Sequence, residues 1–177
     1  MFIKLSSIQT TYKGVYNSFD IFKFLRGKRL KEYLSIHDAD GRIPFTSDNI
    51  YTLLSIVKYI NDLNREICEI IVYGKFVKIM RDKRFESIFY GYDVAGDSLY
   101  HSSVFRAFFE NPDEIYFREI RTCYLNRLNN NGLFYDRSDA DEFASYIQLH
   151  NEEGVFEQDG RLFPIMIYNI KEVTSLY

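Results

Sequence analysis

The hydrophobic positions of this chain of 177 residues follow a helical period most clearly after Thr46 and Ser47. The side chain of either residue can cap the exposed N–H groups at the start of a helix. The residues beyond them recur at the three-and-four spacing that lines one helix face. They are Ile50, Leu53, Leu54, Val57, Ile60, Leu63 and Ile67. The spacing predicts a long amphipathic helix.

Weaker periodic segments predict more helices. Ser18 is a candidate cap for a helix that carries Phe19, Phe22 and Leu25 on one face and is interrupted at Gly27. Ser138 is a candidate cap for a helix near the C-terminal end, and the run of residues 129–132 marks the end of the helix before it. Further helices are expected over residues 28–36, 75–84, 98–110, 112–129 and 139–150.

Strands are expected where short β-branched or alternating runs are bounded by turn residues. Residues 1–8 alternate, and residues 67–73 form a β-branched run that stops at Gly74. Polar turns are expected at residues 37–41 and 93–97. Asp159-Gly160 is a tight-turn pair, and Pro164 favours an edge or a bulge for the strand that follows it. The other expected strands are residues 85–92, 132–135, 155–157 and 162–168.

Helices and strands do not alternate regularly enough for a doubly wound parallel sheet. The pattern instead predicts an α+β fold with a mixed or antiparallel sheet, about five to six helices packed on it and a C-terminal β-hairpin. No repeat or linker interrupts the series, so residues 1–177 are expected to form a single globular domain.

Composition bears on the contact surface and on the cellular compartment. The chain has 16 Phe and 15 Tyr but no Trp, and surplus Tyr suits a protein contact surface. The same bias is typical of AT-rich coding sequences, which indicates a phage or bacterial source. Cys68 and Cys123 lie in apolar stretches and are expected to be buried, reduced thiols. We find no export signal and no apolar run of about 18 residues, so we expect a cytoplasmic protein without membrane contact.

Charge is distributed unevenly along the chain. Residues 1–84 contain 15 Lys and Arg against 9 Asp and Glu, a net charge of +6. Residues 85–177 contain 7 against 16, a net charge of −9. Opposite fields of this kind steer encounters with charged macromolecules.

The sequence contains no diagnostic catalytic motif. His37, His101 and His150 are far apart, and Asp38 and Asp40 do not fit the ligand spacing of a calcium loop. The glycines are scattered singly, and no nucleophile elbow is present. We therefore expect no catalytic residue, no metal and no cofactor, and the pattern favours a protein that is not an enzyme.

Three ordered fragments nevertheless resemble the ADP-ribosyltransferase family. They are residues 99–103, residues 132–135 followed by Ala140, Phe143, Ala144 and Tyr146, and residues 166–168. The resemblance implies that His101 holds the ribose of nicotinamide adenine dinucleotide and that Tyr135 lines its nicotinamide pocket. The family also has a Glu at the head of a late strand, where this chain has Pro164 or Ile165. The resemblance therefore implies a degenerate member unless Glu152, Glu153 or Glu157 replaces that carboxylate.

The preferred hypothesis is a non-enzymatic inhibitor or immunity-type protein that binds and blocks a macromolecular partner. Its acidic face would steer towards a basic protein, and two tyrosines would supply the desolvated contact. This face comprises Asp136, Asp139, Asp141, Glu142, Glu152 and Glu153 with Tyr135 and Tyr146. The alternatives are an ADP-ribosyltransferase-like domain and a nucleic-acid-binding protein. The nucleic-acid-binding residues would be Lys75, Lys78, Arg81, Lys83 and Arg84.

Overall fold

The computed structural model describes most of the chain and divides it into two compact units. The described residues are 1–17, 19–64, 67–78, 84–99, 101–110, 115–150 and 160–173. Unit 1 comprises Met1–Thr10, Asn17–Phe89 and Tyr168–Tyr177, and unit 2 comprises Thr11–Tyr16 and Tyr90–Ile167. The single domain over residues 1–177 stays a prediction.

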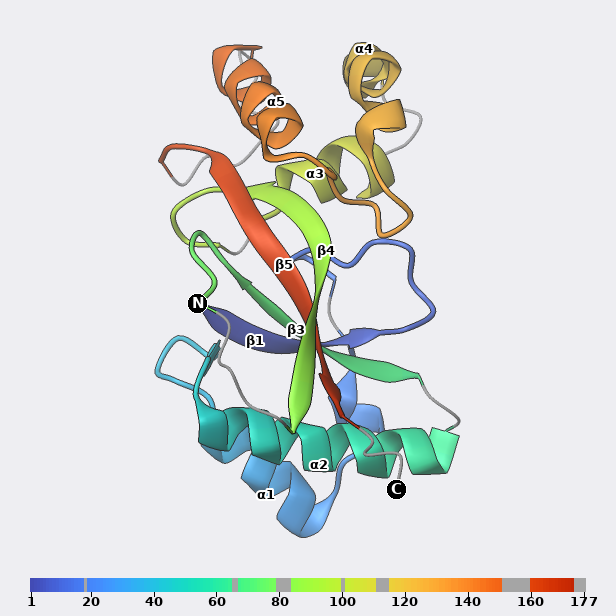
Figure 1. The fold of residues 1–177 in the computed structure, drawn as a ribbon, viewed down its shortest axis with the longest axis vertical. Coiled ribbons are helices and arrows are strands. Elements are labelled where there is room, and N and C mark those ends of the chain that lie inside the picture. The colour runs from blue at the N-terminus through green and yellow to red at the C-terminus, as the bar shows by residue number, and fades with distance from the viewer. Residues whose placement is uncertain are drawn as a thin grey trace. The chain divides into compact units, whose positions relative to one another are not determined.

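The five strands form one antiparallel sheet in the order β2-β1-β3-β5-β4. They are β1 (Phe2–Ser7), β2 (Ile43–Pro44), β3 (Cys68–Gly74), β4 (Phe85–Ala95) and β5 (Phe163–Glu172). In β1, Ile3 lies opposite Ile43 of β2 and Val72 of β3. The predicted α+β class with an antiparallel sheet is confirmed (Figure 1). The first strand of the expected C-terminal hairpin lies outside the described residues, whereas its last strand is β5.

The helices vary greatly in length. They are α1 (Gly27–Ser35), α2 (Ser47–Asn64), α3 (Ser103–Phe105), α4 (Ile115–Tyr124) and α5 (Arg137–His150). The described residues also form three shorter helical elements of other types. They are the 3-10 helices η1 (Ile21–Lys23) and η3 (Leu125–Arg127) and the π-helix η2 (Arg106–Glu110). In unit 1, α1 lies beside α2, and α2 packs against β3 (Figure 1).

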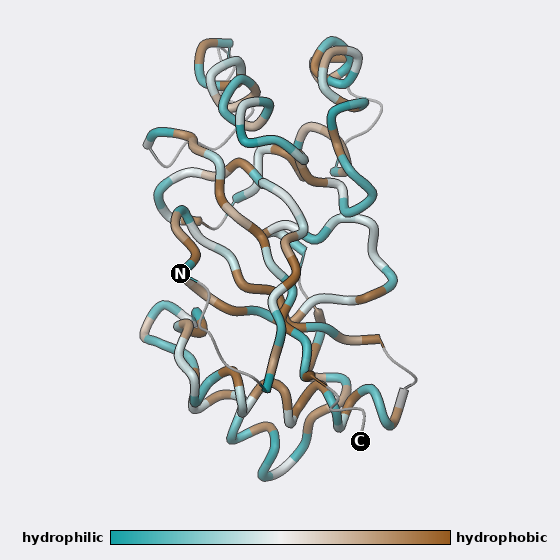
Figure 2. Tube along the Cα trace, viewed as in Figure 1, coloured by the Kyte–Doolittle hydropathy of each residue, from teal (hydrophilic) through white to brown (hydrophobic). Residues whose placement is uncertain are grey.

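The long predicted helix is confirmed as α2. Thr46 caps it, because its Oγ1 accepts a hydrogen bond of 3.2 Å from the backbone N–H of Asn49. Ile50, Leu53 and Ile60 are fully buried, and the colours of Figure 2 alternate along the helix. Leu63 is 59% exposed, so the apolar face ends earlier than the spacing predicts.

Several local predictions are wrong. Between Phe19 and Leu25 the chain makes only the short turn η1, and the proposed cap Ser18 lies outside the described residues. Residues 75–78 are irregular rather than helical, and residues 132–135 contribute only isolated bridges. Residues 98–110 contain a three-residue helix followed by a π-helix instead of one regular helix.

The predicted turn at residues 93–97 is also wrong, because β4 continues through Ala95. Asp93, Val94 and Ala95 are fully buried, so the strand is extended by residues that cannot lie in a surface turn. At the other end of unit 2, α5 begins at Arg137. Ser138 therefore lies in the first turn of that helix and is not its cap.

The two cysteines differ in environment. Burial raises the pKa of the Cys68 thiol to about 12, as expected for a thiol in an apolar core. Cys123 is exposed, so the expectation that both thiols are buried is wrong for this residue. Neither takes part in a disulfide. Within the described part of the chain, no helix is both long and apolar enough to cross a membrane.

Candidate functional site

A buried carboxylate organises unit 2. Asp93 Oδ1 accepts hydrogen bonds from Ser102 Oγ at 2.5 Å and from its neighbour Val94 N–H at 2.8 Å. Asp93 Oδ2 accepts one from Val15 N–H at 2.9 Å and one from the hydroxyl of Tyr12. Four donors from three chain segments thus converge on one side chain that has no exposed surface.

Burial controls the protonation of this network. It raises the pKa of Asp93, although the hydrogen bonds from Ser102, Tyr12 and the backbone oppose the change. Burial and the neighbouring carboxylate raise the pKa of Tyr12 well above its ordinary value, so its hydroxyl remains a donor. The backbone passes so close that a methyl group at Gly14 would overlap Tyr12 and Asp93.

The network also includes a residue that lines a pocket, Ser102. Ser102 Oγ accepts a hydrogen bond of 3.0 Å from Phe105 N–H and so caps the short helix α3. Beside this cap lies a pocket of about 210 Å³. It is lined by Tyr16, His101, Ser102, Ser103, Phe105, Arg106 and Glu110. The residues around this one cavity therefore carry an imidazole, three hydroxyls, a guanidinium and a carboxylate.

One wall of the pocket is aromatic. The rings of Tyr16 and Phe105 stack with centroids 4.5 Å apart and planes inclined by 20°. The ring of Tyr12 packs on Phe105 at 5.2 Å and on Phe109 at 5.3 Å, measured between ring centroids. The stacked pair is thus held against the buried network.

The pocket is also lined by an ion pair on an unusual helix. Arg106 Nη1 lies 2.8 Å from Glu110 Oε2, and the two side chains are 39% and 31% exposed. Both belong to the π-helix η2, a rare conformation that occurs frequently at functional sites. Leu99, two residues before His101, has φ of 58°, a strained value for a residue with a branched side chain.

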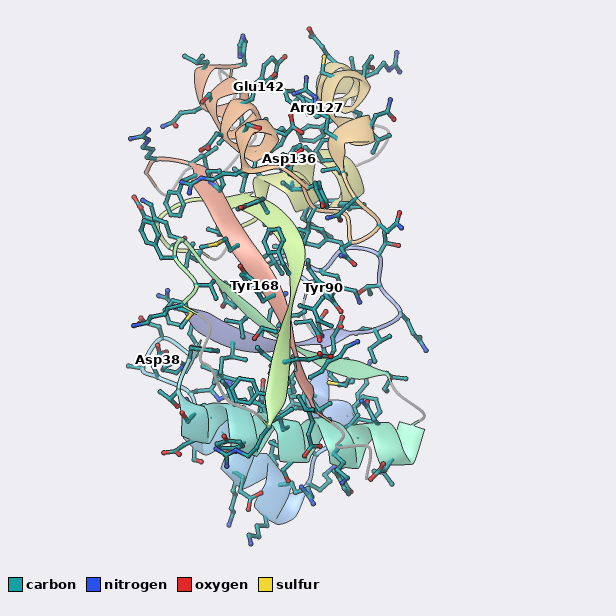
Figure 3. The ribbon with its side chains drawn as sticks, in the orientation of Figure 1. Asp38, Tyr90, Arg127, Asp136, Glu142 and Tyr168 are labelled. Carbon is teal, nitrogen blue, oxygen red and sulfur yellow. The ribbon has the colours of Figure 1, made fainter. Side chains whose placement is uncertain are left out.

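The predicted acidic face is only partly exposed. Arg127 Nη1 contacts Asp139 Oδ1 at 3.1 Å and Glu142 Oε2 at 2.7 Å, and Figure 3 shows Arg127 and Glu142 on neighbouring elements. The hydrogen bond from Arg127 lowers the pKa of Glu142. Asp141 lies 3.5 Å from Arg137, whereas Asp136 is exposed just before α5. Glu152 and Glu153 lie outside the described residues.

The two tyrosines proposed as anchors differ in exposure. Tyr135 is 71% exposed at the start of α5. Tyr146 is half-buried, because its ring stacks on His150 at 4.3 Å and contacts Tyr124 at 5.8 Å. Tyr135 is therefore the better placed of the two to contact a partner.

The basic segment is described in part. Lys75 and Lys78 are exposed, and Phe76 between them is 73% exposed. The Arg84 guanidinium lies 4.2 Å above the Tyr51 ring. Both line a second pocket, in unit 1, of about 500 Å³. Arg81 and Lys83 lie outside the described residues.

The residues to which the ADP-ribosyltransferase resemblance assigns roles lie in different surroundings. His101 lines the pocket of unit 2, but Tyr135 is not among the lining residues. Ile165, at the place of the family's carboxylate, is a fully buried core residue, and Pro164 beside it is also buried. Glu157 lies outside the described residues. The chain matches no known family model, no curated protein and no solved structure.

Charge separates along the boundaries of the two compact units. Unit 1 contains 15 Lys and Arg and 11 Asp and Glu, a net charge of +4. Unit 2 contains 7 and 14, a net charge of −7. Ion pairs such as Lys28 with Glu32 in unit 1 and Arg127 with Glu142 in unit 2 join residues of the same unit. Pairs of this kind leave the net charge of each unit unchanged.

Proposed function

We propose that this chain is a non-enzymatic inhibitor or immunity-type protein that binds a basic macromolecular partner through its acidic unit 2. The observation that carries the proposal is the concentration of negative charge, −7, in one compact unit. A field of one sign raises the rate of encounter with an oppositely charged surface.

The contact itself is assigned to the start of α5. Tyr135 is exposed beside the exposed carboxylate of Asp136, so an aromatic ring and a charge are presented together. Asp141 continues the charged surface along the helix. Ala140, Phe143, Ala144 and Ile147 bury the opposite side of α5, which gives this surface a rigid support. Aromatic residues on rigid supports are the usual anchors of protein interfaces.

To test the acidic contact, the chain is immobilised and the partner that it retains is purified. The rate of association between the chain and this partner is then measured. Neutralising the exposed carboxylates in the double variant Asp136→Asn, Asp141→Asn should slow association and weaken its dependence on salt. Tyr135→Ala should leave the association rate nearly unchanged and speed dissociation, because the ring acts after encounter.

The matched control is Asp48→Asn, Asp62→Asn, which makes the same charge change at exposed positions of α2 in unit 1. Equal association rates for the two double variants would remove the assigned surface. An association rate of the unmodified chain that is insensitive to salt would remove the electrostatic mechanism altogether.

A second candidate, a nucleic-acid-binding protein, is favoured by one observation in unit 1. Phe76 is exposed between the exposed cations Lys75 and Lys78, and binding of single-stranded nucleic acid uses this combination of aromatic faces and positive charge. Arg84 would extend the same basic surface.

This candidate is tested with a fluorescent single-stranded oligonucleotide. Phe76→Ala and Lys75→Gln, Lys78→Gln should each weaken binding, and the double variant should also reduce the salt dependence of the affinity. Lys28→Gln, Lys31→Gln, at exposed positions of α1, is the control. An equal loss of oligonucleotide affinity in both double variants would indicate nonspecific electrostatic attraction. It would exclude a binding site at Lys75, Phe76 and Lys78.

A further inference from the structure

The pocket of unit 2 has no part in the proposed partner contact, yet its walls carry complementary hydrogen-bonding groups. We propose that this pocket binds a guanine base, stacked on the aromatic wall of Tyr16 and Phe105 and recognised at its edge by Arg106 and Glu110. The ligand class is therefore a guanine nucleoside or a guanine nucleotide.

The volume limits the ligand to a single ring system. Pockets for drug-sized molecules enclose roughly 300–1,000 Å³. The pocket of unit 2 encloses about 210 Å³, which suits one bicyclic base with its sugar projecting outwards. The exposed His101 lines the same pocket.

The aromatic wall supplies a face for stacking. Tyr16 is 44% exposed, and its ring is nearly parallel to that of Phe105. Proteins hold unpaired bases by stacking them on aromatic side chains and by bonding their Watson–Crick edges. The wall accounts for the stacking contact but does not distinguish one base from another.

The ion pair of Arg106 and Glu110 can distinguish guanine from the other bases. A guanidinium donates hydrogen bonds, and guanine offers the acceptors O6 and N7. A carboxylate accepts hydrogen bonds, and guanine offers the neighbouring donors N1–H and N2–H. Adenine has no such pair of adjacent donors. Arg106 and Glu110 already lie side by side on one wall of the pocket, as a reader of this edge requires.

A second observation on Arg106 indicates that one N–H of its guanidinium lacks a hydrogen-bond acceptor in the described part of the chain. Its Nε is buried, and among the described residues it has no hydrogen-bond partner. Buried donors in folded proteins are almost always paired, because an unpaired donor loses its bonds to water without replacement. A rotation of the guanidinium towards a base in the pocket would give this N–H an acceptor.

The backbone around the pocket is held before any ligand arrives. Asp93 fixes Ser102, Ser102 caps α3, and the π-helix η2 follows directly with both edge residues. The strained φ of Leu99 lies at the other side of His101. Preorganised groups of this kind lose little entropy on binding, which makes a small ligand sufficient.

The charge of the unit suggests the probe. A net charge of −7 disfavours phosphates, so the neutral nucleoside guanosine isolates recognition of the base. Binding is measured by calorimetry and by the nitrogen and proton shifts of the Arg106 Nε–H signal. Saturable binding with a shift of this signal is the expected result.

Related nucleosides test which edge is read. Inosine lacks the N2 amine, so it should bind about tenfold more weakly than guanosine. Adenosine should bind more weakly still. Equal affinities for guanosine and adenosine, or no saturable binding of guanosine to the unmodified chain, would overturn the proposal.

Variants assign the site. Glu110→Gln should weaken guanosine binding by about tenfold and reduce the preference over adenosine. Glu119→Gln, the same change at an exposed position of α4, is the control and should bind like the unmodified chain. Tyr16→Leu, also at an exposed position, should weaken all nucleosides alike because it removes the stacking face. Indistinguishable behaviour of Glu110→Gln and Glu119→Gln would contradict the assignment.

Discussion

The two compact units are stabilised in different ways. In unit 1 the core is mainly aliphatic, with Ile50, Leu53 and Ile60 of α2 packed among residues of β1 and β3. In unit 2, Asp93 is fully buried among polar groups, and one of its donors, Tyr12, packs against the ring of Phe105. Aliphatic side chains are stable in a core without hydrogen-bond partners. A buried carboxylate is stable only where hydrogen-bond donors are positioned to reach it.

This difference indicates which unit carries the more specialised chemistry. The described part of unit 2 combines the buried network with the π-helix η2 and the strained residue Leu99. Features that lower stability by themselves persist where the surrounding structure compensates for them, and they concentrate at functional sites. Unit 1 also has a buried polar contact, from Asn169 Nδ2 to Glu69 Oε2 at 2.8 Å.

Removing the central carboxylate should have the largest effect. Asp93→Ala leaves the donors of Tyr12, Ser102, Val15 and Val94 without their acceptor, so we expect a loss of about 4 kcal/mol in the free energy of unfolding. Urea denaturation measures it. Asp97→Ala, at an exposed position four residues further on, should change stability by less than about 0.5 kcal/mol. Similar values for both variants would remove the contrast between the units.

The aliphatic core of unit 1 should respond to the loss of volume. Leu53→Ala removes buried methyl groups and is expected to lower the free energy of unfolding by about 3 kcal/mol. The same change at the exposed Leu63 should cost far less, because little burial is lost. Equal destabilisation by the two changes would show that α2 does not pack as described.

The network of unit 2 should also respond to pH. Burial raises the pKa of Asp93 in the folded protein above its value in the unfolded chain. At a pH between these two pKa values, the folded protein therefore retains a proton that the unfolded chain has lost. Stability from this group is fully present below the unfolded pKa and declines as pH rises through the folded pKa. Asp93→Asn cannot titrate.

Urea denaturation of both proteins at several pH values tests this sign. The stability advantage of the unmodified protein over Asp93→Asn should narrow as the pH rises from acid to neutral. Other carboxylates titrate alike in both proteins, so their effects cancel in the comparison. An advantage that widens with pH would mean that hydrogen bonding to the ionised carboxylate outweighs burial.

The smallest expected effect concerns the cap of α2. Thr46→Ala removes the hydrogen bond to Asn49 N–H and should cost about 1 kcal/mol. Ser47→Ala, one residue inside the helix, should cost less, because Thr46 and not Ser47 accepts the capping hydrogen bond from Asn49 N–H. A larger loss for Ser47→Ala, measured by thermal unfolding, would move the start of the helix.

Local periodicity was sufficient to predict several elements of this fold. The face of α2, the β-branched strand β3 and the strand β5 each have patterns that depend on neighbours within a few residues. The carboxylates of α5 were also placed on a helix near its N-terminal end for the same reason. These predictions succeeded because the interactions that form the elements lie within the segments themselves.

Only the tertiary structure decided the environment of the functional groups. Asp93 follows an apparent strand and precedes Gly96 and Asp97, a pattern typical of a turn, yet it is buried by donors from Tyr12 and Val15. These donors are 78 to 81 residues away in the chain, and no local pattern encodes such a meeting. The apolar Val94 and Ala95 were the one signal that Asp93 lies inside a strand.

The same reason explains the acidic face and the pocket. Arg127, 12 to 15 residues before its partners, engages Asp139 and Glu142 and leaves Asp136 exposed. Tyr16 stacks on Phe105 and lines the same pocket as Arg106 and Glu110, although these residues lie far from it in the sequence. The identity of a side chain determines which hydrogen bonds it can donate or accept. Its burial and its actual partners depend on distant segments, and these determine whether it is paired, buried or exposed in the folded protein.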